Sequence, residues 1–386
     1  MAAATGLLLC AAWYYTILAG FYTLYCPAMY IMFLNHKLYR KIVDALFALW
    51  ELYPVALFQW CSNAQLHHFG DYVNPNESTI IVINHRTRVD WNYVWIALYH
   101  ATQSATECTC KEKPGRELKE SHFLDIGGSS KLKFVLKDEL KAIPGMGWIM
   151  QLNFFLYVKR NWREDQLSLA QFVDYHKRLG CQPRVVLFPE GTDLSEDNKR
   201  RSEIFATAHN LLLYEYVLHP RTTGFAALCS RLRPRLASVY DATLAYDAPA
   251  QTEADLLRGT IPRHIYFYCK RYPIEDLPHE DDLLKSWLND RWREKESSLR
   301  KFHENGQFVD SGTKRAHPER TPRSLQIAVI GFMFWLGVDS IFTYGLLTNV
   351  LFRFWVLYHS LFLVFVTRYF GGFQNIQYKL SEYFKL

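Results

Sequence analysis

The segment with the clearest chemical potential is Asn84-His85-Arg86-Thr87-Arg88-Val89-Asp90. It follows a run of β-branched residues, so it begins where a strand is expected to end. An imidazole is the side chain best suited to take a proton near neutral pH. Asp90 starts the next apolar segment and can reach back to the other ring nitrogen of His85, which would fix the tautomer. The alternative is a turn-capping histidine beside a surface aspartate.

A second segment of interest is Phe188-Pro189-Glu190-Gly191-Thr192, which follows another apolar run. Proline and glycine in this order predict a rigid turn, and backbone N–H groups in such a turn can face an anion. A plain β-turn is the alternative. Loops at strand ends expose side chains on a rigid scaffold, so both segments are candidates for one site.

Other reaction types are not indicated. Ser129 and Ser130 follow two glycines and do not form a GxSxG elbow, and Gly145 and Gly147 do not open a GxGxxG loop. No cysteine and histidine set has zinc-ligand spacing. We therefore expect no metal and no cofactor. The eight cysteines are scattered, and we expect reduced thiols in a cytosol-facing protein.

The elements that position these segments are expected to form an α/β domain with a mixed sheet covered by helices. Short apolar runs predict strands at Ser78–Ile83, Arg184–Phe188 and Ile265–Tyr268, and an aromatic-rich helix is expected over Asp90–His100. Residues 102–133 are polar and are expected to form a long loop.

The N-terminal end of the chain is strongly apolar. The run from Leu7 to Leu34 has no charged residue and exceeds the ~20 residues needed to cross a bilayer. It is expected to be a retained anchor, and a re-entrant element is the alternative because Gly20 and Pro27 could bend it. Residues 42–60 are expected to form a helix at the membrane interface.

The C-terminal end predicts a transmembrane hairpin. Ser324–Thr367 contains only two charged residues, Asp339 and Arg353, and a turn is expected at Gly345–Asn349. We expect these two charges to pair, because unpaired charges in lipid are costly. Basic residues after the first span and at both ends of the hairpin place these flanks in the cytosol.

These assignments divide the 386 residues into four parts. The expected parts are an anchor with an interfacial helix (1–60), an α/β domain (61–300), a basic linker (301–323), and the hairpin with its tail (324–386). A formal net charge of +6 fits a protein that faces anionic head groups. It is too diffuse to indicate a nucleic-acid partner.

The order NHxxxxD and then FPEGT resembles the glycerophospholipid acyltransferase family. NHRTRVDW, FPEGTDLSEDNKRRS, YEYVLHPRTTGF and RYPIEDLP are similar to its lysocardiolipin acyltransferase branch. The resemblance runs from about residue 20 to about residue 370. It implies the glycerolipid acyltransferase fold and transfer from acyl-CoA, a substrate, to a lysophospholipid at a bilayer. It also implies the endoplasmic reticulum or a related endomembrane, with the catalytic domain in the cytosol.

The resemblance also implies residue roles. His85 would be the general base and Asp90 its partner. The substrate-binding set would comprise Arg88, Lys137, Arg160, Glu190, Gly191, Thr192, Pro220 and Arg221. Arg160 ends the family's second block and would bind phosphate, unless it is a solvated strand end. The glycine that often opens this block is Phe154 here, which argues against a close backbone approach.

Several alternatives remain open at this stage. The acceptor could be lysophosphatidylinositol, lysophosphatidylglycerol, lysocardiolipin or lysophosphatidic acid. The same His/Asp pair could instead serve a membrane lipid hydrolase, or His85 could be structural in a non-catalytic membrane scaffold. Loop 102–133 could be an insertion or a flap over the acyl-CoA site. The sequence indicates neither the acyl-chain preference nor the oligomeric state.

Overall fold

The computed structural model describes residues 2–62, 64–112, 131–247, 252–306, 308 and 322–384. The chain divides into two compact units. The first consists of Met1–Leu7, Leu57–Glu117 and Arg184–Ser324, and the second of Leu8–Ala56, Leu118–Pro183 and Leu325–Leu386.

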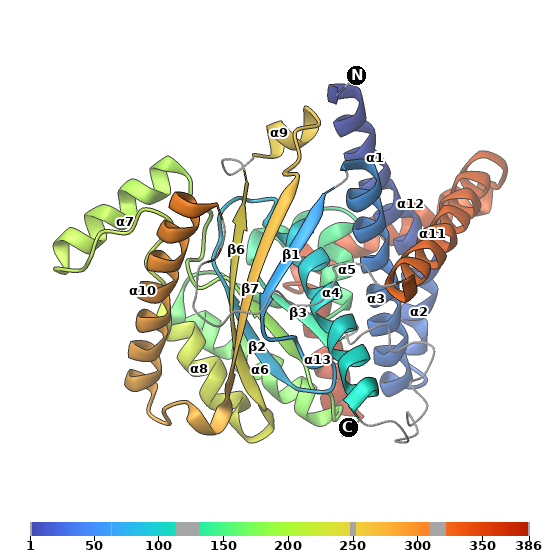
Figure 1. The fold of residues 1–386 in the computed structure, drawn as a ribbon. Helices are drawn as coiled ribbons and strands as arrows, with labels where there is room; N and C mark the ends of the chain where they lie inside the picture. The colour runs from blue at the N-terminus through green and yellow to red at the C-terminus, as the bar shows by residue number, and fades with distance from the viewer. Residues whose placement is uncertain are drawn as a thin grey trace. The chain divides into compact units, whose positions relative to one another are not determined.

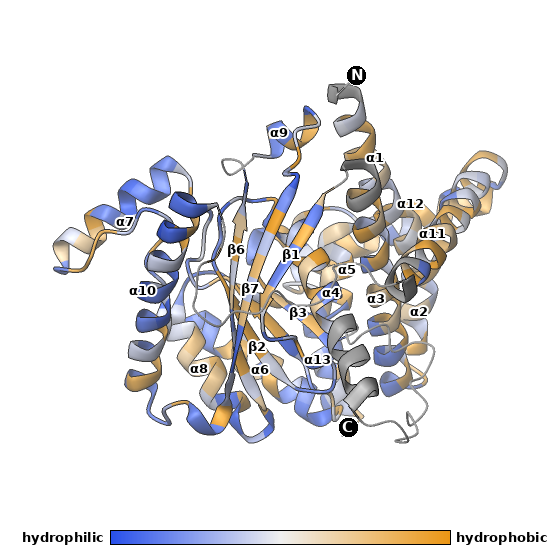
Figure 2. Ribbon diagram, viewed as in Figure 1, coloured by the Kyte–Doolittle hydropathy of each residue, from blue (hydrophilic) through white to orange (hydrophobic). Residues whose placement is uncertain are grey.

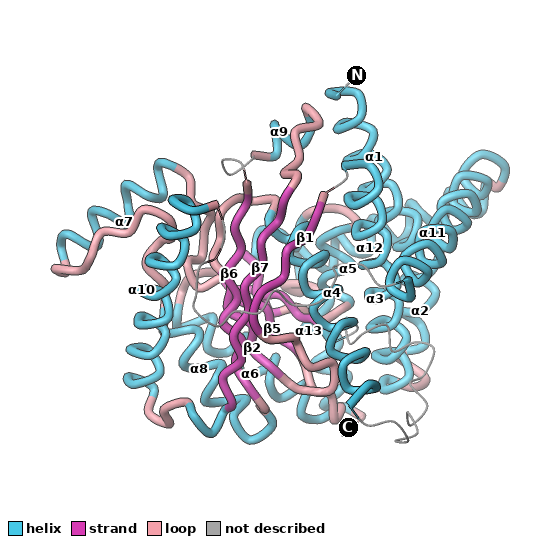
Figure 3. The backbone as a smooth tube through the Cα atoms, viewed as in Figure 1, coloured by secondary structure: helices cyan, strands magenta, loops and turns pink. Residues whose placement is uncertain are grey.

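The first unit is built on a sheet in which the strands lie in the order β1-β7-β6-β2-β5 (Figures 1 and 3). Their bounds are β1 Gln65–Gly70, β2 Thr79–Ile83, β5 Arg184–Leu187, β6 Ser238–Tyr246 and β7 His264–Pro273. Strand β2 is parallel to both β5 and β6, β6 is antiparallel to β7, and β7 is parallel to β1. The mixed α/β fold expected from the sequence is confirmed.

The centre of this sheet is the dry core of the first unit. All residues of β2 and of β6 are buried, and so are the first three of β5. Parallel strands covered on both faces require such unbroken apolar runs, which explains why β2 and β5 were recognisable in the sequence.

Helices accompany the sheet in the first unit. They are α4 Asp90–Glu112, α7 Glu196–Ala208, α8 Thr222–Leu232, α9 Glu253–Leu257 and α10 Asp281–Asn305, with short 3-10 helices η4 Arg233–Arg235 and η5 Ile274–Asp276. Helix α10 packs on α8 and β6. It buries Leu288 and Trp292 completely, and about one turn further along the same helix face it buries Lys295.

The predicted loop over residues 102–133 is shorter than expected. Helix α4 continues through the start of the 102–133 segment to Glu112, because no glycine or proline interrupts the chain before Pro114. The far end of the segment is strand β3, which begins at Leu132. The loop prediction was therefore wrong at both ends, and residues 113–130 lie outside the described part of the chain.

The linker prediction over 301–323 was wrong at its start in the same way. Helix α10 runs to Asn305 and ends at Gly306, which has the left-handed φ of +72° that glycine tolerates. Most of the remaining linker, residues 309–321, lies outside the described residues.

The second unit contains two parallel strands and most of the apolar helices. The strands are β3 Leu132–Lys137 and β4 Leu156–Val158. The helices that lie wholly or mostly in this unit are α1 Ala2–Gly20, η1 Phe21–Tyr25, α2 Cys26–Ile31, α3 His36–Ser62, η3 Asp138–Ala142, α5 Met146–Leu152, α6 Trp162–Arg178, α11 Pro322–Thr348, α12 Val350–Tyr369 and α13 Phe373–Tyr383. Thr5–Ile31, Gln326–Thr348 and Val350–Tyr369 are long and apolar enough to cross a membrane.

The N-terminal helix passes both of its expected bending points without a break. Residues Phe21–Tyr25 form a π-helical segment, which accommodates the missing N–H group of Pro27 just beyond it. Gly20 serves close packing instead of bending, because a Cβ atom there would lie 2.6 Å from the indole of Trp335. The helix thus fits the apolar anchor predicted from the sequence.

Helix α3 contains the predicted interfacial segment 42–60. Much of it is buried by protein, and its charges are used internally. Asp44 accepts from Arg40 at 2.8 Å and from Lys133 of β3 at 2.7 Å. Arg40, one of the basic residues that follow the first predicted span, is therefore a buried structural cation.

The C-terminal hairpin has its turn at Asn349, as predicted, but the expected pair of charges does not form. The guanidinium of Arg353 donates to the carbonyl oxygens of Leu346 and Leu347 at 2.7 and 2.8 Å. Asp339 accepts from the hydroxyl of Thr16 at 3.0 Å. Arg353 lies one turn beyond Asn349, so it reaches the open carbonyl groups at the end of α11, whereas Asp339 lies further back along its helix.

Candidate active site

The two candidate segments leave the sheet side by side. Strands β2 and β5 are parallel with Val82 opposite Leu187, so the residues that follow them meet at the carboxyl edge of the sheet. The side chain of Asn84 extends the pairing of β2 with β6: its Nδ2 donates to the carbonyl of Leu244 at 3.0 Å, and its Oδ1 accepts from the Leu244 N–H at 2.8 Å. The residue before His85 therefore fixes where the strand ends.

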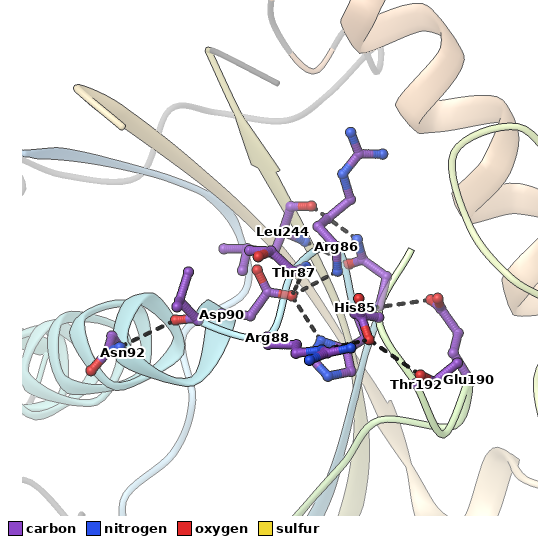
Figure 4. Close-up of polar contacts among 12 residues, drawn as sticks. His85, Arg86, Thr87, Arg88, Asp90, Asn92, Glu190, Thr192 and Leu244 are labelled. Atoms are coloured by element: carbon purple, nitrogen blue, oxygen red, sulfur yellow. Dashed lines mark hydrogen bonds and ion pairs between the residues drawn. The ribbon is translucent and has the colours of Figure 1, made fainter. Parts of the chain in front are cut away.

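His85 and Asp90 are in direct contact (Figure 4). The His85 Nδ1 atom lies 3.0 Å from Asp90 Oδ2, so the neutral ring carries its proton on Nδ1 and donates to the carboxylate. This leaves the Nε2 lone pair without a hydrogen-bond partner among the described residues. The imidazole packs on the ring of Phe188, and about 19% of its side chain is exposed. The contact is the one expected from the sequence, and the catalytic roles remain a prediction.

Asp90 is completely buried and satisfied by four donors. Its Oδ2 also accepts from the backbone N–H groups of Arg86 at 2.6 Å and Thr87 at 2.9 Å, and its Oδ1 accepts from the Tyr246 hydroxyl at 2.6 Å. Burial, together with the charge of Asp90, raises the pKa of Tyr246, so the phenol stays protonated and donates. The carboxylate is held between the histidine loop and β6.

The electrostatics of His85 favour its charged form. Burial opposes protonation of the ring, but the hydrogen bond and charge of Asp90, with smaller effects of Glu190 and Asp193, outweigh burial and raise the pKa of His85. A ring with a raised pKa is a stronger base, and the buried carboxylate would stabilise the imidazolium formed when it accepts a proton.

The Phe188–Thr192 segment forms the expected turn. The N–H of Gly191 donates to the carbonyl of Phe188 at 2.9 Å, and Gly191 has a φ of +72°. A Cβ atom at Gly191 would lie 3.3 Å from the Arg221 side chain, which runs alongside the turn. The Arg221 N–H donates to the carbonyl of Pro189 at 2.7 Å, so the segment that holds Pro220 is tied to this turn.

Glu190 faces the protein interior. Its Oε1 accepts from the backbone N–H of His85 at 3.1 Å and from the indole of Trp292 at 3.4 Å, and its Oε2 accepts from the N–H of Leu218 at 3.2 Å. Burial raises the pKa of Glu190 to about 7, although these hydrogen bonds and His85 oppose the rise. The observed contacts give Glu190 a positioning role, and a direct contact with substrate stays a prediction.

Thr192 and Arg88 lie on the open side of the turn. The Thr192 hydroxyl donates to Asp193 at 3.2 Å and accepts from Asn198 at 3.0 Å. Arg88 is 66% exposed and approaches Asp193 at 3.4 Å and Glu253 at 3.8 Å.

Lys137 and Arg160 belong to the second unit and are described within it. Both are exposed, and they lie at the same end of the parallel pair β3–β4, where Lys137 is opposite Val158. Arg160 has a left-handed φ of +63°, as does Phe154 at +56°. Phe154 thus adopts the backbone conformation that glycine would favour at this position, and it stacks on Tyr175 at 3.7 Å between ring centroids.

The sequence did not reveal every residue that shapes the site. Tyr246 and Trp292 come from β6 and α10, far from either segment in sequence. Lys295 is fully buried and donates to Asp241 at 2.6 Å, to the Ala242 carbonyl at 2.5 Å and to Thr243 at 3.0 Å. In the sequence, the only indication of the buried Lys295–Asp241 pair was that Asp241 lies within an apolar run. Among the described residues, no group of three His, Cys, Asp or Glu could hold a metal ion.

Comparison of the chain with protein-family models and with known proteins identifies its relatives. The acyltransferase family model matches residues 120–247, and the acyltransferase C-terminus model matches residues 255–335. Lysocardiolipin acyltransferase 1 of Gallus gallus is 35% identical over 366 residues, covering 93% of this chain and 90% of that protein. Lysophosphatidylinositol acyltransferase 10 of Caenorhabditis elegans is 30% identical over 388 residues, covering 96% of this chain and 93% of that protein.

A more distant similarity is to a solved structure. The 1-acyl-sn-glycerophosphate acyltransferase PlsC from Thermotoga maritima superimposes with a TM-score of 0.45 and 14% sequence identity, covering 80% of this chain and all of that chain (100%).

The positioning role of Glu190 is testable by Glu190→Gln. Both carboxylate oxygens accept hydrogen bonds, so an amide group would turn a donor toward a donor. We expect a loss of about 1–3 kcal/mol in the free energy of unfolding, as for other unsatisfied buried groups. A lower thermal unfolding midpoint in detergent at pH 8 would show it. Glu253→Gln, at a half-exposed carboxylate of α9, is the matched control and should leave the midpoint unchanged. Equal midpoints for all three proteins would contradict the role.

Proposed function

The chain belongs to the glycerophospholipid acyltransferase family, and on this premise we propose that it transfers a fatty acyl group from acyl-CoA to a free hydroxyl group of a lysophospholipid. The proposed acceptors are lysocardiolipin, lysophosphatidylinositol, lysophosphatidylglycerol and lysophosphatidic acid. The names of the relatives from chicken and worm favour the first two. The reaction would serve phospholipid synthesis and acyl-chain remodelling.

The observation that carries the proposal is the orientation of the His85 ring. Nδ1 is committed to a buried carboxylate at 3.0 Å, so the basic electron pair is on Nε2. Such a ring can take the proton of an acceptor hydroxyl while the hydroxyl oxygen attacks a carbonyl carbon, and base catalysis of this kind contributes ~10²–10⁴-fold. Asp90 would hold the tautomer and stabilise the imidazolium.

The thioester requires no covalent intermediate on the protein. The acceptor oxygen forms a bond to the acyl carbon, the carbon–sulfur bond breaks, and CoA leaves as a thiolate. The proton that His85 removed from the hydroxyl then returns to that sulfur. The products are a phospholipid with two neighbouring ester groups and free CoA, so no proton or electron is gained or lost.

Four of the residues proposed to bind substrate are cations. Arg88 and Arg221 are exposed beside the glycine turn in the first unit, and Lys137 and Arg160 are exposed at one end of β3–β4 in the second. Guanidinium groups suit phosphate because they donate two parallel hydrogen bonds. We assign the acceptor phosphate to Arg160 and leave the CoA phosphates to the remaining cations.

The host membrane is proposed to be the endoplasmic reticulum or a related endomembrane, with the catalytic unit in the cytosol. Three helices suit a bilayer in length and composition, and cations such as Lys37 and Lys41 follow the first of them. Both substrates carry long acyl chains that partition into the bilayer. A membrane-bound enzyme would therefore meet them at high local concentration.

The activity is testable with labelled acyl-CoA and a panel of lysophospholipids. Microsomes with the wild-type protein should form labelled phospholipid, and His85→Ala should reduce the rate by about 10²–10⁴-fold because the base is lost. His279→Ala, at an exposed histidine of the same unit, is the control and should keep full activity.

Two results would overturn the assignment. Release of labelled fatty acid without any lysolipid would indicate a hydrolase. Label incorporation with wild type that is no greater than with a folded His85→Ala protein would indicate a non-catalytic scaffold.

The pH profile tests the coupling of His85 to Asp90. The base must be unprotonated, so kcat/KM should fall as the pH drops through the raised pKa of His85. Asp90→Asn removes the charge that raises this pKa and leaves burial, which lowers it. The acidic limb should therefore move to lower pH as the maximal rate falls. Glu190→Gln removes a carboxyl whose pKa is raised to about 7 and whose charge raises the pKa of His85 less than Asp90 does, so its acidic limb should move less than that of Asp90→Asn. An unmoved limb in Asp90→Asn would refute the coupling.

The proposed topology is testable at Asn76. This exposed residue begins a glycosylation sequon in the first unit, Asn76-Glu77-Ser78. A cytosolic catalytic unit should leave it unmodified when the protein is made in microsomes. A mass shift removed by glycosidase, and absent in Asn76→Gln, would place the unit in the lumen.

A further inference from the structure

Helix α7 ends in an exposed apolar turn that the proposed reaction does not use. The helix extends away from the sheet of its own unit, with its C-terminal end outermost (Figure 1). Five large apolar side chains lie at this end, each between 44% and 64% exposed: Ile204, Phe205, Leu211, Leu212 and Leu213. We call these five residues the α7 tip. The hydropathy colouring changes from blue at the start of α7 to pale and orange at its end (Figure 2).

The α7 tip is a built structure. Asn210 has a left-handed φ of +53°, and the N–H of Leu211 donates back to the carbonyl of Ala206 at 2.9 Å, as in a Schellman cap. The imidazole of His219 lies 2.9 Å from the carbonyl oxygen of Leu212. The leucines are thus displayed by a capped turn whose main chain is fixed from both sides.

The chain that returns from the tip is also fixed. Glu296 of α10 accepts from the N–H groups of Glu215 at 3.0 Å and Tyr216 at 2.8 Å. A few residues on, Leu218 donates to Glu190, which also holds the backbone of His85. These hydrogen bonds hold the tip away from the rest of its unit. The apolar side chains of the tip are therefore exposed to solvent and gain no packing contact within that unit.

Cations lie one turn behind the apolar end. Arg200 and Arg201 are exposed and precede Ile204 and Phe205 by four residues each, so each arginine lies behind an apolar side chain on the same helix face. Lys199 adds a third charge. None of these three cations forms an ion pair within the described residues. Four residues of helix correspond to a rise of ~6 Å.

This arrangement matches the depth profile of a lipid bilayer surface. Apolar side chains enter the interface by ~5–10 Å, and basic side chains one turn back then lie among the phosphate groups. Each juxtamembrane cation adds attraction to anionic lipids. We propose that the α7 tip inserts into the head-group region of a bilayer that contains anionic lipid. The docking concerns the membrane alone and does not depend on the chemistry of His85.

Charge favours a bilayer over a protein as the occupant. Helix α7 also carries three acids: Glu196 and Asp197 lie farther from the tip than the cations, and Glu203 lies beside them. The cations behind the apolar tip complement a surface that is anionic outside and apolar beneath. The chain also carries three candidate membrane spans, Thr5–Ile31, Gln326–Thr348 and Val350–Tyr369. If they anchor the chain, the bilayer is already present and the tip need not bind it independently. A weakly inserting tip can therefore act at high effective concentration of its ligand.

The test uses the full chain reconstituted in phosphatidylcholine vesicles, with and without phosphatidylserine. An environment-sensitive fluorescent amino acid is introduced at position 212 by amber suppression, and the vesicle lipids carry quenchers in their acyl chains. We expect about twofold or stronger quenching in the anionic vesicles, because the label must reach the acyl boundary to be quenched. The same label at position 282, where the aspartate side chain is 91% exposed, is the control and should not be quenched.

Two further arms separate the contributions of charge and apolar surface. Arg200→Gln with Arg201→Gln should reduce the quenching at position 212 in anionic vesicles, and high salt should do the same to the parent protein. Leu213→Ser with Ile204→Ser should abolish it. Both pairs are exposed, so unchanged thermal midpoints are expected.

Quenching at position 212 no stronger than at position 282 would overturn the proposal and leave a protein partner as the occupant of the tip. Equal quenching in vesicles with and without phosphatidylserine would overturn the assignment to anionic lipid. Because the readout is depth in the bilayer, either outcome is independent of whether the acyl transfer occurs.

Discussion

The carboxylate of Asp90 is the charge around which the candidate active site is organised. A fully buried anion is costly unless it is well hydrogen-bonded, and this one accepts from an imidazole, two backbone N–H groups and a phenol. Those donors come from the loop after β2 and from the end of β6. Satisfying a single charge therefore fixes the ring orientation of His85, the path of its loop and the start of α4 together.

Other buried charged side chains near the candidate site are also satisfied by hydrogen bonds to the backbone. Glu190 and Glu296 are buried acids whose oxygens accept backbone N–H groups, and Lys295 is a buried cation that binds β6. Irregular loops cannot satisfy their own backbone groups as helices and sheets do, so side chains must supply the partners. Helix α10 supplies two of these three residues, which explains why a helix remote from the candidate site in sequence is needed to shape it.

The sequence predicted what is local and missed what is long-range. Strands β2 and β5 were found because unbroken apolar runs are recognisable without their neighbours. Strand β6 was missed because Asp241 and Thr243 interrupt its apolar pattern, and their partner Lys295 lies on a distant helix. The contact of His85 with Asp90 was expected because five residues separate them, whereas nothing near either residue pointed to Tyr246.

The errors share one physical cause. Polar composition was taken as loop at residues 102–112 and 301–305, but a helix exposed on one side continues until a glycine or proline stops it, as Gly306 does. The expected Asp339–Arg353 pair neglected the backbone, whose carbonyl groups at a helix end compete for an arginine as well as a carboxylate does. In an apolar hairpin, peptide groups without a hydrogen-bond partner are costly, as unpaired charges are.

The amide of Asn84 has a consequence for what this position can accept. Its side chain offers one donor and one acceptor at the spacing of a peptide bond. It therefore adds one further pair of hydrogen bonds between β2 and β6 beyond the point where the main chain of β2 leaves the sheet. Aspartate would set an oxygen against a carbonyl, leucine would leave both groups of Leu244 unbonded, and glutamine would overshoot by a methylene. The asparagine of the NHxxxxD pattern therefore has a structural role that strand geometry prescribes.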